Sequence, residues 1–314
     1  MIYDLAILGG GPAGTAAGVY AARKRLKTVF ITKDWNGQST VSEGIENWIG
    51  EIKISGMDLS KKLETHLKAY AKGIINIKEG ELAVELKKTT GKTSDKTANS
   101  FKITSDKNSY EAKTVLITTG SSRRKLEIPG AKEYDNKGIV YCASCDGPLY
   151  SDQDVAIIGG GNAAFETAAQ LLAYCKSVTM LVRSDFKADQ VTIDKVLKHP
   201  KMTAIKGVIP KEVKGEKFVT GLIYSDKNTG KDITLPVTGI FVEIGSIPNT
   251  DFTKNIVDLD PYNHIITNPK NQRSSIEGIW AAGDCTDGLY HQNNIAAGDA
   301  VKAVEDIYLH LHAR

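Results

Sequence analysis

Cysteine is scarce in this sequence, and long hydrophobic runs are absent. The 314 residues contain only four cysteines, too few and too unevenly spaced for the disulfide framework of a small secreted domain. The longest apolar stretches, such as Val155 to Ile158, are far shorter than the ~20 residues that a membrane-spanning helix requires. We therefore expect no membrane span and no structural disulfide network.

An excess of charge of one sign is also missing. Lys and Arg number 40 and Asp and Glu 37, which gives a formal net charge of +3. Such a balance creates no long-range field for phosphate backbones or anionic membranes, so neither nucleic acid nor a membrane is an expected partner. An apolar run begins at Ile2 without a basic leader, so we expect no secretory signal and a cytoplasmic location.

Two segments of the chain resemble each other, at residues 3–14 and 154–164. Each is an apolar run, then a glycine-rich turn, then an Ala-rich stretch, which predicts a strand, a turn and a helix. The helices are expected at about 12–25 and 163–174, and each precedes an apolar strand, at 28–31 and 177–182. The sequence therefore predicts two βαβ units and an α/β fold.

The remaining segments divide the chain. Residues 82–111 alternate apolar and polar side chains around a Lys/Thr/Ser-rich stretch at 87–100, which predicts antiparallel strands joined by an exposed loop that is the least structured part of the chain. Apolar strands expected at 115–117 and 239–244 each run into a glycine-containing turn, and these turns are candidate domain crossings. A last strand at 278–282 precedes an amphipathic helix at 294–311 that is expected to return to the first domain.

The first glycine motif has the G-x-G-x-x-G spacing at Gly9, Gly11 and Gly14. Glycines at these positions permit a tight turn, a close approach to a pyrophosphate and close helix packing. The alternative is a glycine turn without a ligand, but the position between a strand and a helix favours dinucleotide binding. A ribose-binding acid is expected ~20 residues further on, and Asp34 is the candidate.

The second motif, Gly159, Gly161 and Ala164, has the related G-x-G-x-x-A spacing, so a second dinucleotide is expected. An acid after the following strand selects NADH, whereas an Arg there meets the 2′-phosphate of NADPH. Arg183 stands at that point with Lys187 nearby, which favours NADPH. Asp185 keeps NADH open, and the alternative for Arg183 is a solvated side chain.

Cys142 and Cys145 are separated by two residues and followed by Asp146. A Cys-x-x-Cys pair is within disulfide reach and commonly lowers one thiol pKa, which suits dithiol–disulfide exchange. A zinc site would need two further ligands, but Cys175 and Cys285 are isolated and no His-rich tract exists. Redox chemistry is therefore favoured over zinc, no metal site is expected, and Cys175 and Cys285 are expected to be inert.

These features in this order resemble the low-molecular-weight thioredoxin reductase family and the reductase core of the alkyl hydroperoxide reductase flavoprotein. The resemblance spans Asp4 to the C-terminal helix, with matching motifs at residues 9–14, 37–38, 45–48, 142–147, 159–163 and 281–285. It implies two Rossmann-like, three-layer dinucleotide-binding domains, the second inserted in the first. The implied domains are 1–120 and 249–314 for FAD, and 121–248 for the pyridine nucleotide and the Cys pair.

The resemblance also implies roles for single residues. Asp284 is expected to hold the ribityl chain of FAD, with Gln38 and Asn47 near the flavin and Gln292 and Asn293 beside its ring. The full set of expected FAD residues is Gly9, Gly11, Pro12, Ala13, Gly14, Asp34, Gly37, Gln38, Asn47, Thr119, Gly120, Gly283, Asp284, Gln292, Asn293 and Ile295. The expected pyridine-nucleotide residues are Gly159, Gly161, Asn162, Ala163, Ala164, Arg183 and Lys187.

The implied activity is electron transfer from NADPH through FAD and the Cys pair to the disulfide of thioredoxin or a thioredoxin-like protein. The family pattern makes Cys145 the flavin-facing sulfur and Cys142 the exchanging thiol. Asp146 is the expected proton donor, with a helix-capping carboxylate as the alternative. Hinges near 121–124 and 247–249 are expected to let the inserted domain swivel, and a homodimer is expected.

The chain departs from the family where thioredoxin reductases have a His-Arg-Arg run and a later Arg, of which only Arg183 remains. Two alternatives therefore stay open. The first is an NADH-dependent reductase of a glutaredoxin-like or peroxiredoxin-linked protein, because residues 148–149 and 187–190 look like the hydroperoxide reductase flavoprotein. The second is a ferredoxin-fed flavoprotein disulfide reductase that does not use nicotinamide.

Overall fold

The computed structural model describes residues 2–42, 44–92 and 97–313, without the side chains of residues 41, 90–92, 97–99 and 145. The chain forms two compact units. Unit 1 comprises residues 1–43, 48–122 and 247–314, and unit 2 comprises 44–47 and 123–246. Two short strands, β7 (Ser121–Arg123) and β16 (Ser246–Pro248), pair with each other where the chain passes from one unit to the other.

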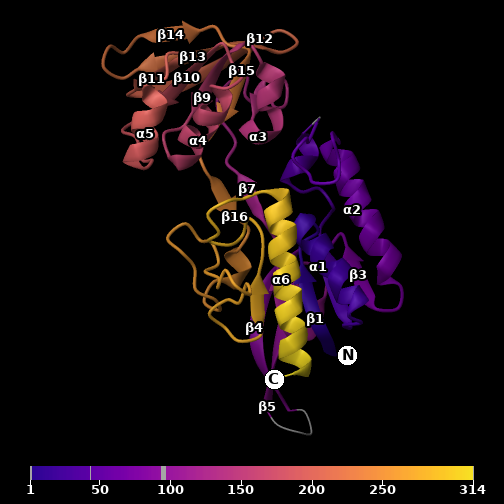
Figure 1. The fold of residues 1–314 in the computed structure, drawn as a ribbon. Helices are drawn as coiled ribbons and strands as arrows, with labels where there is room; N and C mark the ends of the chain where they lie inside the picture. The colour runs from indigo at the N-terminus through magenta and orange to yellow at the C-terminus, as the bar shows by residue number, and fades with distance from the viewer. Residues whose placement is uncertain (1, 43, 93–96, 314) are drawn as a thin grey trace. The chain divides into compact units, whose positions relative to one another are not determined.

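Unit 1 is built on a seven-stranded sheet (Figure 1). Its parallel part has the order β3-β2-β1-β6, β17 is also parallel to β6, and the antiparallel strands β5 and β4 extend the sheet beyond β6. The strands are β1 (Ile2–Leu8), β2 (Thr28–Thr32), β3 (Ile75–Glu79), β4 (Ala83–Lys92), β5 (Thr97–Ser105), β6 (Ser109–Ile117) and β17 (Ile279–Ala281).

Three helices, α1 (Pro12–Arg23), α2 (Gly56–Ala71) and α6 (Asn293–His312), contribute to the core on one face of this sheet. Helices α1 and α6 lie side by side, and small residues such as Ala17 and Ala300 are fully buried between them. This close packing joins the C-terminal helix to the first βαβ unit, as the sequence predicted. Short 3-10 turns, η1 (Gln38–Val41) and η3 (Asp251–Thr253), complete the unit.

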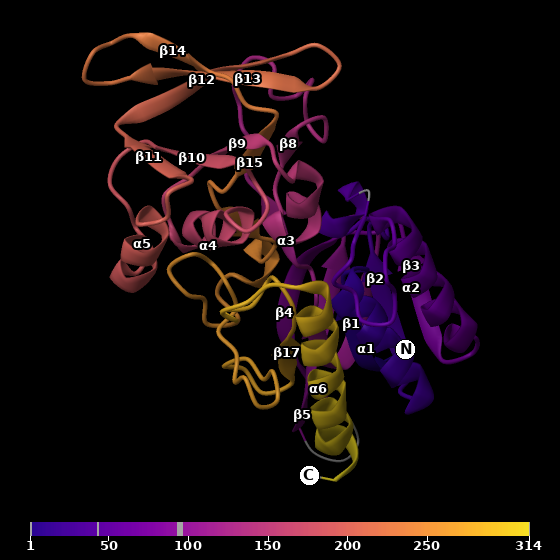
Figure 2. The same cartoon turned by 45° about the horizontal axis from the view of Figure 1, so that its top comes forward.

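Unit 2 has three layers (Figure 2). Its middle layer is a five-stranded parallel sheet of order β11-β10-β9-β15-β8. The strands are β8 (Ile139–Val140), β9 (Asp154–Ile158), β10 (Ser177–Val182), β11 (Met202–Lys206) and β15 (Gly239–Val242). One face packs on helical segments and the other on an antiparallel sheet. The helical segments are α3 (Ala143–Asp146), η2 (Gly147–Tyr150), α4 (Asn162–Leu171) and α5 (Gln190–Leu197), and the antiparallel strands are β12 (Val208–Gly215), β13 (Val219–Asp226) and β14 (Asp232–Leu235).

The structure confirms the predicted α/β class with parallel sheets. The antiparallel strands predicted within residues 82–111 are present as β4 and β5. Of the stretch at 87–100 that was predicted to be the least structured, the parts up to 92 and from 97 lie in these strands, and residues 93–96 lie outside the described residues. Strand β4 continues to Lys92, β5 begins at Thr97, and pairs such as Lys88 with Phe101 join them. The strands extend further into the polar stretch than its composition indicated, because antiparallel pairing needs only backbone groups and a sheet with one solvated face tolerates polar side chains.

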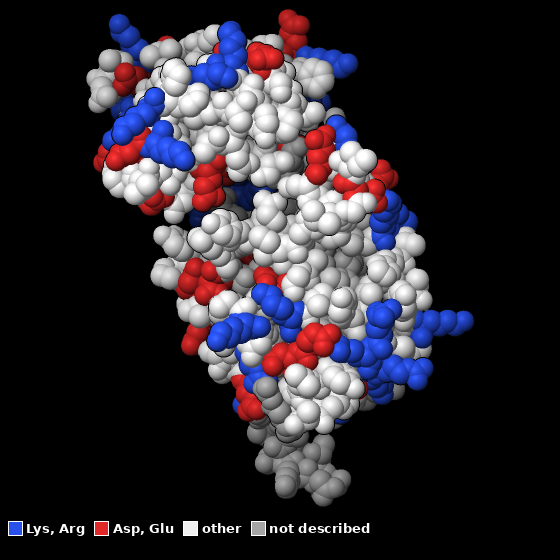
Figure 3. All heavy atoms as spheres, in the orientation of Figure 1, with Lys and Arg blue, Asp and Glu red and all other residues white. Residues whose placement is uncertain are grey.

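Lys and Arg side chains lie among Asp and Glu side chains on the face shown in Figure 3. The sequence has nearly equal numbers of positive and negative side chains, and on this face the two kinds are also intermixed. Among the described residues, no helix combines the length and the apolarity that crossing a bilayer requires.

A buried carboxylate fixes the β3–β4 connection against the β5–β6 turn of unit 1. Glu81 is 6% exposed and accepts hydrogen bonds from Ser105 Oγ at 2.6 Å, Asn108 Nδ2 at 3.0 Å and Tyr110 Oη at 2.9 Å. Burial acts to raise the pKa of Glu81, but the hydrogen bonds outweigh it and hold the pKa below its usual value. Burial and the contact with Glu81 raise the pKa of Tyr110 to about 12. Strand β6, which borders the first glycine motif, is thereby anchored at its start.

We expect Glu81→Gln to lower the free energy of unfolding by about 2 kcal/mol at pH 7, because the amide replaces an acceptor of charge-assisted hydrogen bonds. The folded-state pKa of Glu81 is lowered, so its stabilisation is present above the unfolded-state pKa and is lost as pH falls. The deficit of the variant should therefore shrink below about pH 4.5. Urea titrations at several pH values measure it. Glu85→Gln, at an exposed pair with Lys87, is the control and should change stability by less than about 0.5 kcal/mol. An equal deficit at pH 4 and pH 7 would contradict this account.

Candidate functional site

The first glycine turn joins β1 to α1 at the carboxyl edge of the unit 1 sheet. Gly9 has a φ of +115°, and a Cβ there would lie 2.3 Å from the backbone oxygen of Thr118. A Cβ on Gly14 would lie 1.8 Å from Gly9 O, so neither position accepts a side chain. A Cβ on Gly11, in contrast, would meet no atom within 4 Å. The turn therefore leaves an open space at the N-terminus of α1, where backbone N–H groups suit a phosphate.

Residues distant in the sequence meet at the same edge of unit 1. Gln38 Nε2 donates to Asp284 Oδ2 at 3.2 Å and to Ser121 Oγ at 2.8 Å. Ser39 Oγ donates to Asn293 Oδ1 at 2.9 Å. Asp284 follows β17, Asn293 begins α6 and Gln38 begins η1. Of the residues expected around FAD, Gln38 thus bonds directly to Asp284, and Asn293 bonds to Ser39, the next residue after Gln38.

Other expected FAD residues border this group. Gly283 has a φ of +78°, and a Cβ there would lie 3.4 Å from the Cβ of Ala13, so the Asp284 turn packs on α1. A Cβ on Gly37 would lie 3.8 Å from Pro12 Cδ. Thr119 Oγ1 donates to Asn249 O at 2.8 Å, and Gly120 O accepts from the N–H of Asn249 at 3.0 Å. These contacts hold Gly37 and the Asp284 turn against α1, and they hold the turn after β6 against Asn249.

Three expected FAD residues are placed differently. Asn47 belongs to the short 44–47 segment that groups with unit 2. Gln292 and Ile295 are exposed at the start of α6.

Asp34 follows β2 next to the first glycine turn, since a Cβ on Gly10 would lie 2.8 Å from Asp34 O. Its carboxylate is exposed and accepts a hydrogen bond from the N–H of Asn36 at 2.8 Å. The carboxylate thus has a local structural role, and its expected contact with a ribose stays a prediction.

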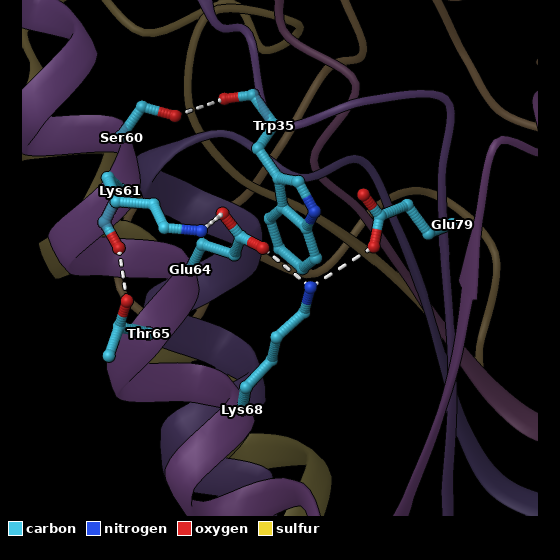
Figure 4. Close-up of polar contacts among 7 residues, drawn as sticks. All are labelled: Trp35, Ser60, Lys61, Glu64, Thr65, Lys68 and Glu79. Atoms are coloured by element: carbon cyan, nitrogen blue, oxygen red, sulfur yellow. Dashed lines mark hydrogen bonds and ion pairs between the residues drawn. The ribbon is translucent and has the colours of Figure 1, made fainter.

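The segment after Asp34 is held by a polar cluster around Trp35 (Figure 4). The Trp35 ring stacks on Phe30 at 5.6 Å between centroids, and Ser60 Oγ donates to Trp35 O at 2.7 Å. Lys68 Nζ lies 5.3 Å from the centroid of the Trp35 ring and bridges Glu64, at 2.5 Å, and Glu79, at 3.2 Å. These contacts fix the chain beside the glycine turn.

The second glycine turn joins β9 to α4 in unit 2 and repeats the geometry of the first. Gly159 has a φ of +147°, and a Cβ there would lie 2.3 Å from the backbone oxygen of Glu243, which follows β15. A Cβ on Gly161 would meet nothing within 4 Å. Asn162 and Ala163 are exposed at the start of α4, and Ala164 is fully buried beneath it. Unit 2 thus has a second open space at a helix N-terminus.

The loop after β10 folds back onto this turn. The N–H of Lys187 donates to Gly160 O at 2.7 Å, and the N–H of Asp189 donates to Asn162 Oδ1 at 2.9 Å. Arg183 is exposed at the end of β10. The structure therefore brings both expected basic residues to the carboxyl edge beside the second glycine turn.

Two further lysines contact residues 183–186, and neither was predicted from the sequence. Lys227 Nζ donates to Arg183 O at 2.8 Å. Lys206 ends β11, forms an ion pair with Asp185 at 3.1 Å and lies 4.5 Å from the centroid of the Phe186 ring. Asp185, the acid that kept NADH open as a donor, is thus engaged by a lysine. Because β11 is parallel to β10, a strand prediction at 202–206 would have indicated the edge position of Lys206.

Cys142 follows β8 at the same carboxyl edge and is disulfide-bonded. The side chain of Cys145 lies outside the described residues. Asp146 ends α3, and its N–H donates to Cys142 O at 3.0 Å. Ser144 Oγ donates to Gln170 Oε1 at 2.7 Å, which joins the cysteine segment to α4.

Cys175 and Cys285 are free thiols, and both are fully buried. Burial raises the pKa of each to about 11. Both thiols are therefore protonated at neutral pH and poorly reactive, as the sequence predicted.

Glu243, one position after β15, is another residue whose role was not predicted from the sequence. The strand expected at 239–244 simply included it. Its Oε1 accepts a hydrogen bond from Thr167 Oγ1 on α4 at 2.7 Å. Burial raises the pKa of Glu243 to about 7, against the opposing effects of Thr167 and of the charge of Arg123. The sequence feature that could have identified Glu243 is an acidic residue at the end of an apolar strand.

The open space at Gly11 and Gly161 generates a test with matched variants. We expect Gly11→Ala to fold with unchanged stability, because its φ of −73° suits alanine, but to lose FAD. Gly161→Ala should keep FAD and lose the pyridine nucleotide. Gly9→Ala is the contrasting variant and should destabilise the fold by roughly 1–3 kcal/mol or more through its strained φ and its clash. Flavin absorbance after gel filtration, nucleotide calorimetry and thermal melts measure the three outcomes. Retention of FAD at wild-type affinity by Gly11→Ala would show that no dinucleotide lies on this turn.

Comparisons with known proteins agree with this geometry. The sequence profile of the family described as pyridine nucleotide-disulphide oxidoreductase matches residues 3–300. An alkyl hydroperoxide reductase component of Pseudomonas putida is 38% identical over 312 residues, which cover 98% of this chain and 58% of that protein. NADH dehydrogenase of Bacillus subtilis is 35% identical over 303 residues, which cover 96% of this chain and 57% of that protein. The chain therefore spans less than two thirds of the length of these two relatives.

The solved structure of thioredoxin reductase from Streptococcus pyogenes is similar over its whole length. It superposes with a TM-score of 0.88 at 32% identity and covers 100% of this chain and 99% of that one. This likeness confirms the family resemblance and the two-domain fold predicted from the sequence. The chain belongs to the pyridine nucleotide-disulphide oxidoreductase family and is an oxidoreductase of a fold that implies FAD and a nicotinamide cofactor.

Proposed function

We propose that this protein is a flavoprotein disulfide reductase that uses NADPH to reduce the disulfide of a thioredoxin-like protein. One observation supports this most strongly. Disulfide-bonded Cys142 and the second glycine turn lie at the carboxyl edge of one parallel sheet, on strands separated only by β15. A redox-active sulfur and a dinucleotide turn on one edge suit a chain of electron transfers.

Unit 1 is the proposed FAD site. Its backbone at Gly9 to Gly14 would hold the pyrophosphate, and Asp284, oriented by Gln38, would accept from the ribityl hydroxyls. The open space at Gly11 fits this group, because a Cβ there meets nothing within 4 Å. When bound, FAD supplies the chemistry of accepting a hydride and passing an electron pair to a disulfide.

Unit 2 is the proposed nicotinamide nucleotide site, and NADPH is the proposed donor. The turn at Gly159 to Ala164 would hold the pyrophosphate. Arg183, Lys187, Lys206 and Lys227 would surround the 2′-phosphate, and Asp185 is engaged by Lys206. An unengaged acid is the usual partner of the ribose hydroxyls of NADH, so the arrangement favours the phosphorylated nucleotide.

The thiols carry out the exchange chemistry. Cys142 is the proposed attacking thiol toward the acceptor disulfide, and Cys145 its resolving partner. Asp146 is the proposed proton donor to a leaving thiolate; its N–H donates to Cys142 O, which keeps it in the cysteine segment. Buried Cys175 and Cys285 take no part.

The proposed acceptor is thioredoxin or a thioredoxin-like protein, by similarity to the thioredoxin reductase of Streptococcus pyogenes. The similarity to the alkyl hydroperoxide reductase component of Pseudomonas putida supports a second candidate, a glutaredoxin-like or peroxiredoxin-linked protein with NADH as donor. We expect the working unit to be a homodimer, which light scattering measures.

The donor proposal predicts the effect of reversing one charge. Arg183→Asp should raise the KM for NADPH roughly tenfold or more, since a charge-assisted hydrogen bond to phosphate is worth about 1.5–3 kcal/mol. The KM for NADH should change little. Stopped-flow reduction of the bound flavin by each nucleotide measures both values. Lys195→Asp, on the exposed face of α5, is the matched control. Faster flavin reduction by NADH than by NADPH in the unmodified protein would refute the donor proposal, and no reduction by either would favour a ferredoxin-type donor.

The acceptor proposal predicts a separation of two half-reactions. Cys142→Ser should leave flavin reduction by nicotinamide nucleotide near its normal rate but abolish turnover with thioredoxin, because the thiolate is the nucleophile that attacks the acceptor. Cys175→Ser is the control and should keep turnover. Steady-state reduction of purified thioredoxin and glutaredoxin measures the loss. Undiminished turnover of Cys142→Ser would contradict the proposed role.

A further inference from the structure

Glu243 occupies a central place at the carboxyl edge of the unit 2 sheet. Strand β15, which it follows, lies between β9 with its glycine turn and β8 with Cys142 (Figure 2). The register pairs Ile240 with Ile139 and Phe241 with Val140. Two residues beyond the second pair are Glu243 on one strand and Cys142 on the other. The register therefore brings the acid and the cysteine to neighbouring positions at the edge.

Glu243 and Cys142 each lie two residues after a strand residue, Phe241 and Val140 respectively, whose side chain faces the helical layer. Phe241 and Val140 are both buried in the core beneath α4. Side chains two residues apart on a strand project to the same face. Glu243 conforms to this, since its carboxyl group reaches Thr167 on α4. The cysteine segment reaches α4 as well, through Ser144 and Gln170.

The carboxyl group of Glu243 has one oxygen engaged and one available. Thr167 donates to Oε1 at 2.7 Å, and Oε2 has no hydrogen-bond partner among the described residues. The charged groups that act on it are Arg123 from β7 and Glu166 from α4. Its backbone is pressed against the glycine turn, because a Cβ on Gly159 would lie 3.2 Å from the Cβ of Glu243. The acid is thus held in place beside the cysteine segment.

We propose that Glu243 holds the proton that the Cys142 thiol exchanges when its disulfide opens and re-forms. The inference rests on the proposed function in that a two-electron reductant opens the disulfide. The two electrons break the S–S bond and leave the sulfurs of Cys142 and Cys145 as thiolates. The Cys142 thiolate then takes a proton from the Glu243 carboxylic acid, which becomes a carboxylate. When Cys142 attacks an acceptor disulfide, the carboxylate takes this proton back, a mixed disulfide forms and one acceptor sulfur leaves as thiolate.

Glu243 and Asp146 are given different protons. Glu243 exchanges its proton with the Cys142 thiol, whereas Asp146 is the proposed donor to a leaving thiolate. A proton-holding acid must change protonation near the operating pH, and burial raises the pKa of Glu243 to about 7. The two titrations are coupled, because a carboxylate near a thiolate disfavours the second negative charge. Removing the charge of Glu243 should therefore lower the pKa of the Cys142 thiol.

The test measures this coupling on one thiol. In the full flavoprotein with Cys145→Ser, Cys142 is the reactive thiol, because Cys175 and Cys285 are buried. The rate of alkylation of Cys142 by iodoacetamide is followed from pH 5 to 10 after treatment with dithiothreitol, with the site identified by peptide mass spectrometry. We expect two inflections, one near pH 7. Adding Glu243→Gln should remove that inflection and lower the thiol pKa by about one unit relative to the state with Glu243 ionised. Alkylation should then be about twofold faster near pH 7, where about half of Glu243 is still protonated, and roughly fivefold faster near pH 8, where Glu243 is mostly ionised.

Matched variants make the outcome specific. Glu166→Gln on α4 removes a charge that helps to raise the pKa of Glu243, so it should move the inflection near pH 7 to slightly lower pH without removing it, and Asp146→Asn should keep the inflection near pH 7. Thr167→Val, which removes the hydrogen bond but not the acid, should move that inflection to higher pH. Coincident profiles with and without Glu243→Gln, or loss of the inflection in Asp146→Asn instead, would overturn the proposal. Because neither a nicotinamide nucleotide nor an acceptor protein enters the assay, its result is independent of whether the proposed donor and acceptor are correct.

Discussion

One backbone contact occurs in both units, and the rest of each site depends on it. After the first strand of each βαβ unit, a glycine with positive φ passes so close to the neighbouring strand that a Cβ would lie 2.3 Å from a backbone oxygen, of Thr118 in unit 1 and of Glu243 in unit 2. Only glycine permits this approach. The contact places the following helix with its N-terminus at the carboxyl edge and leaves an open space in front of it.

The parallel sheets then gather chemistry at that edge. In unit 1, the residues after β6 and β17 meet the first turn, and Gln38 bonds to Asp284 there. In unit 2, the strand order places Arg183, the glycine turn, Glu243 and Cys142 along one edge in that sequence. Neighbouring parallel strands lie about 4.8 Å apart, so groups far apart in the chain become near neighbours. The edge therefore holds both nucleotide-binding backbone and thiol chemistry.

Much of this could be predicted from the sequence, because local patterns report it directly. The glycine spacing between a strand and a helix predicted both turns, and apolar periodicity predicted the strands around them. Motifs that match a family over most of the chain also indicated that the second domain is inserted in the first. The link from Gln38 to Asp284, 246 positions apart, was expected only through that resemblance, since no local pattern reports it.

The rest required the register and the tertiary contacts. Glu243 looked like the end of a strand, and only its position between β9 and β8 gives it a neighbour in Cys142. Lys206 and Lys227 lie far from Arg183 in the sequence. Lys227 reaches the backbone oxygen of Arg183 from the β13–β14 connection, and Lys206 reaches the nearby Asp185 from the end of β11. The antiparallel strands around residues 87–100 were predicted, but their extent was not, because polar composition does not prevent two strands from pairing through their backbones.

The central claim is that an electron pair from a nicotinamide nucleotide reaches the disulfide of Cys142. The most direct measurement adds one equivalent of NADPH or NADH to the flavoprotein without oxygen, blocks new thiols with an alkylating agent and locates the label by mass spectrometry. The account predicts that Cys142 becomes labelled while Cys175 and Cys285 remain unlabelled. A bleached flavin with Cys142 still disulfide-bonded would contradict it.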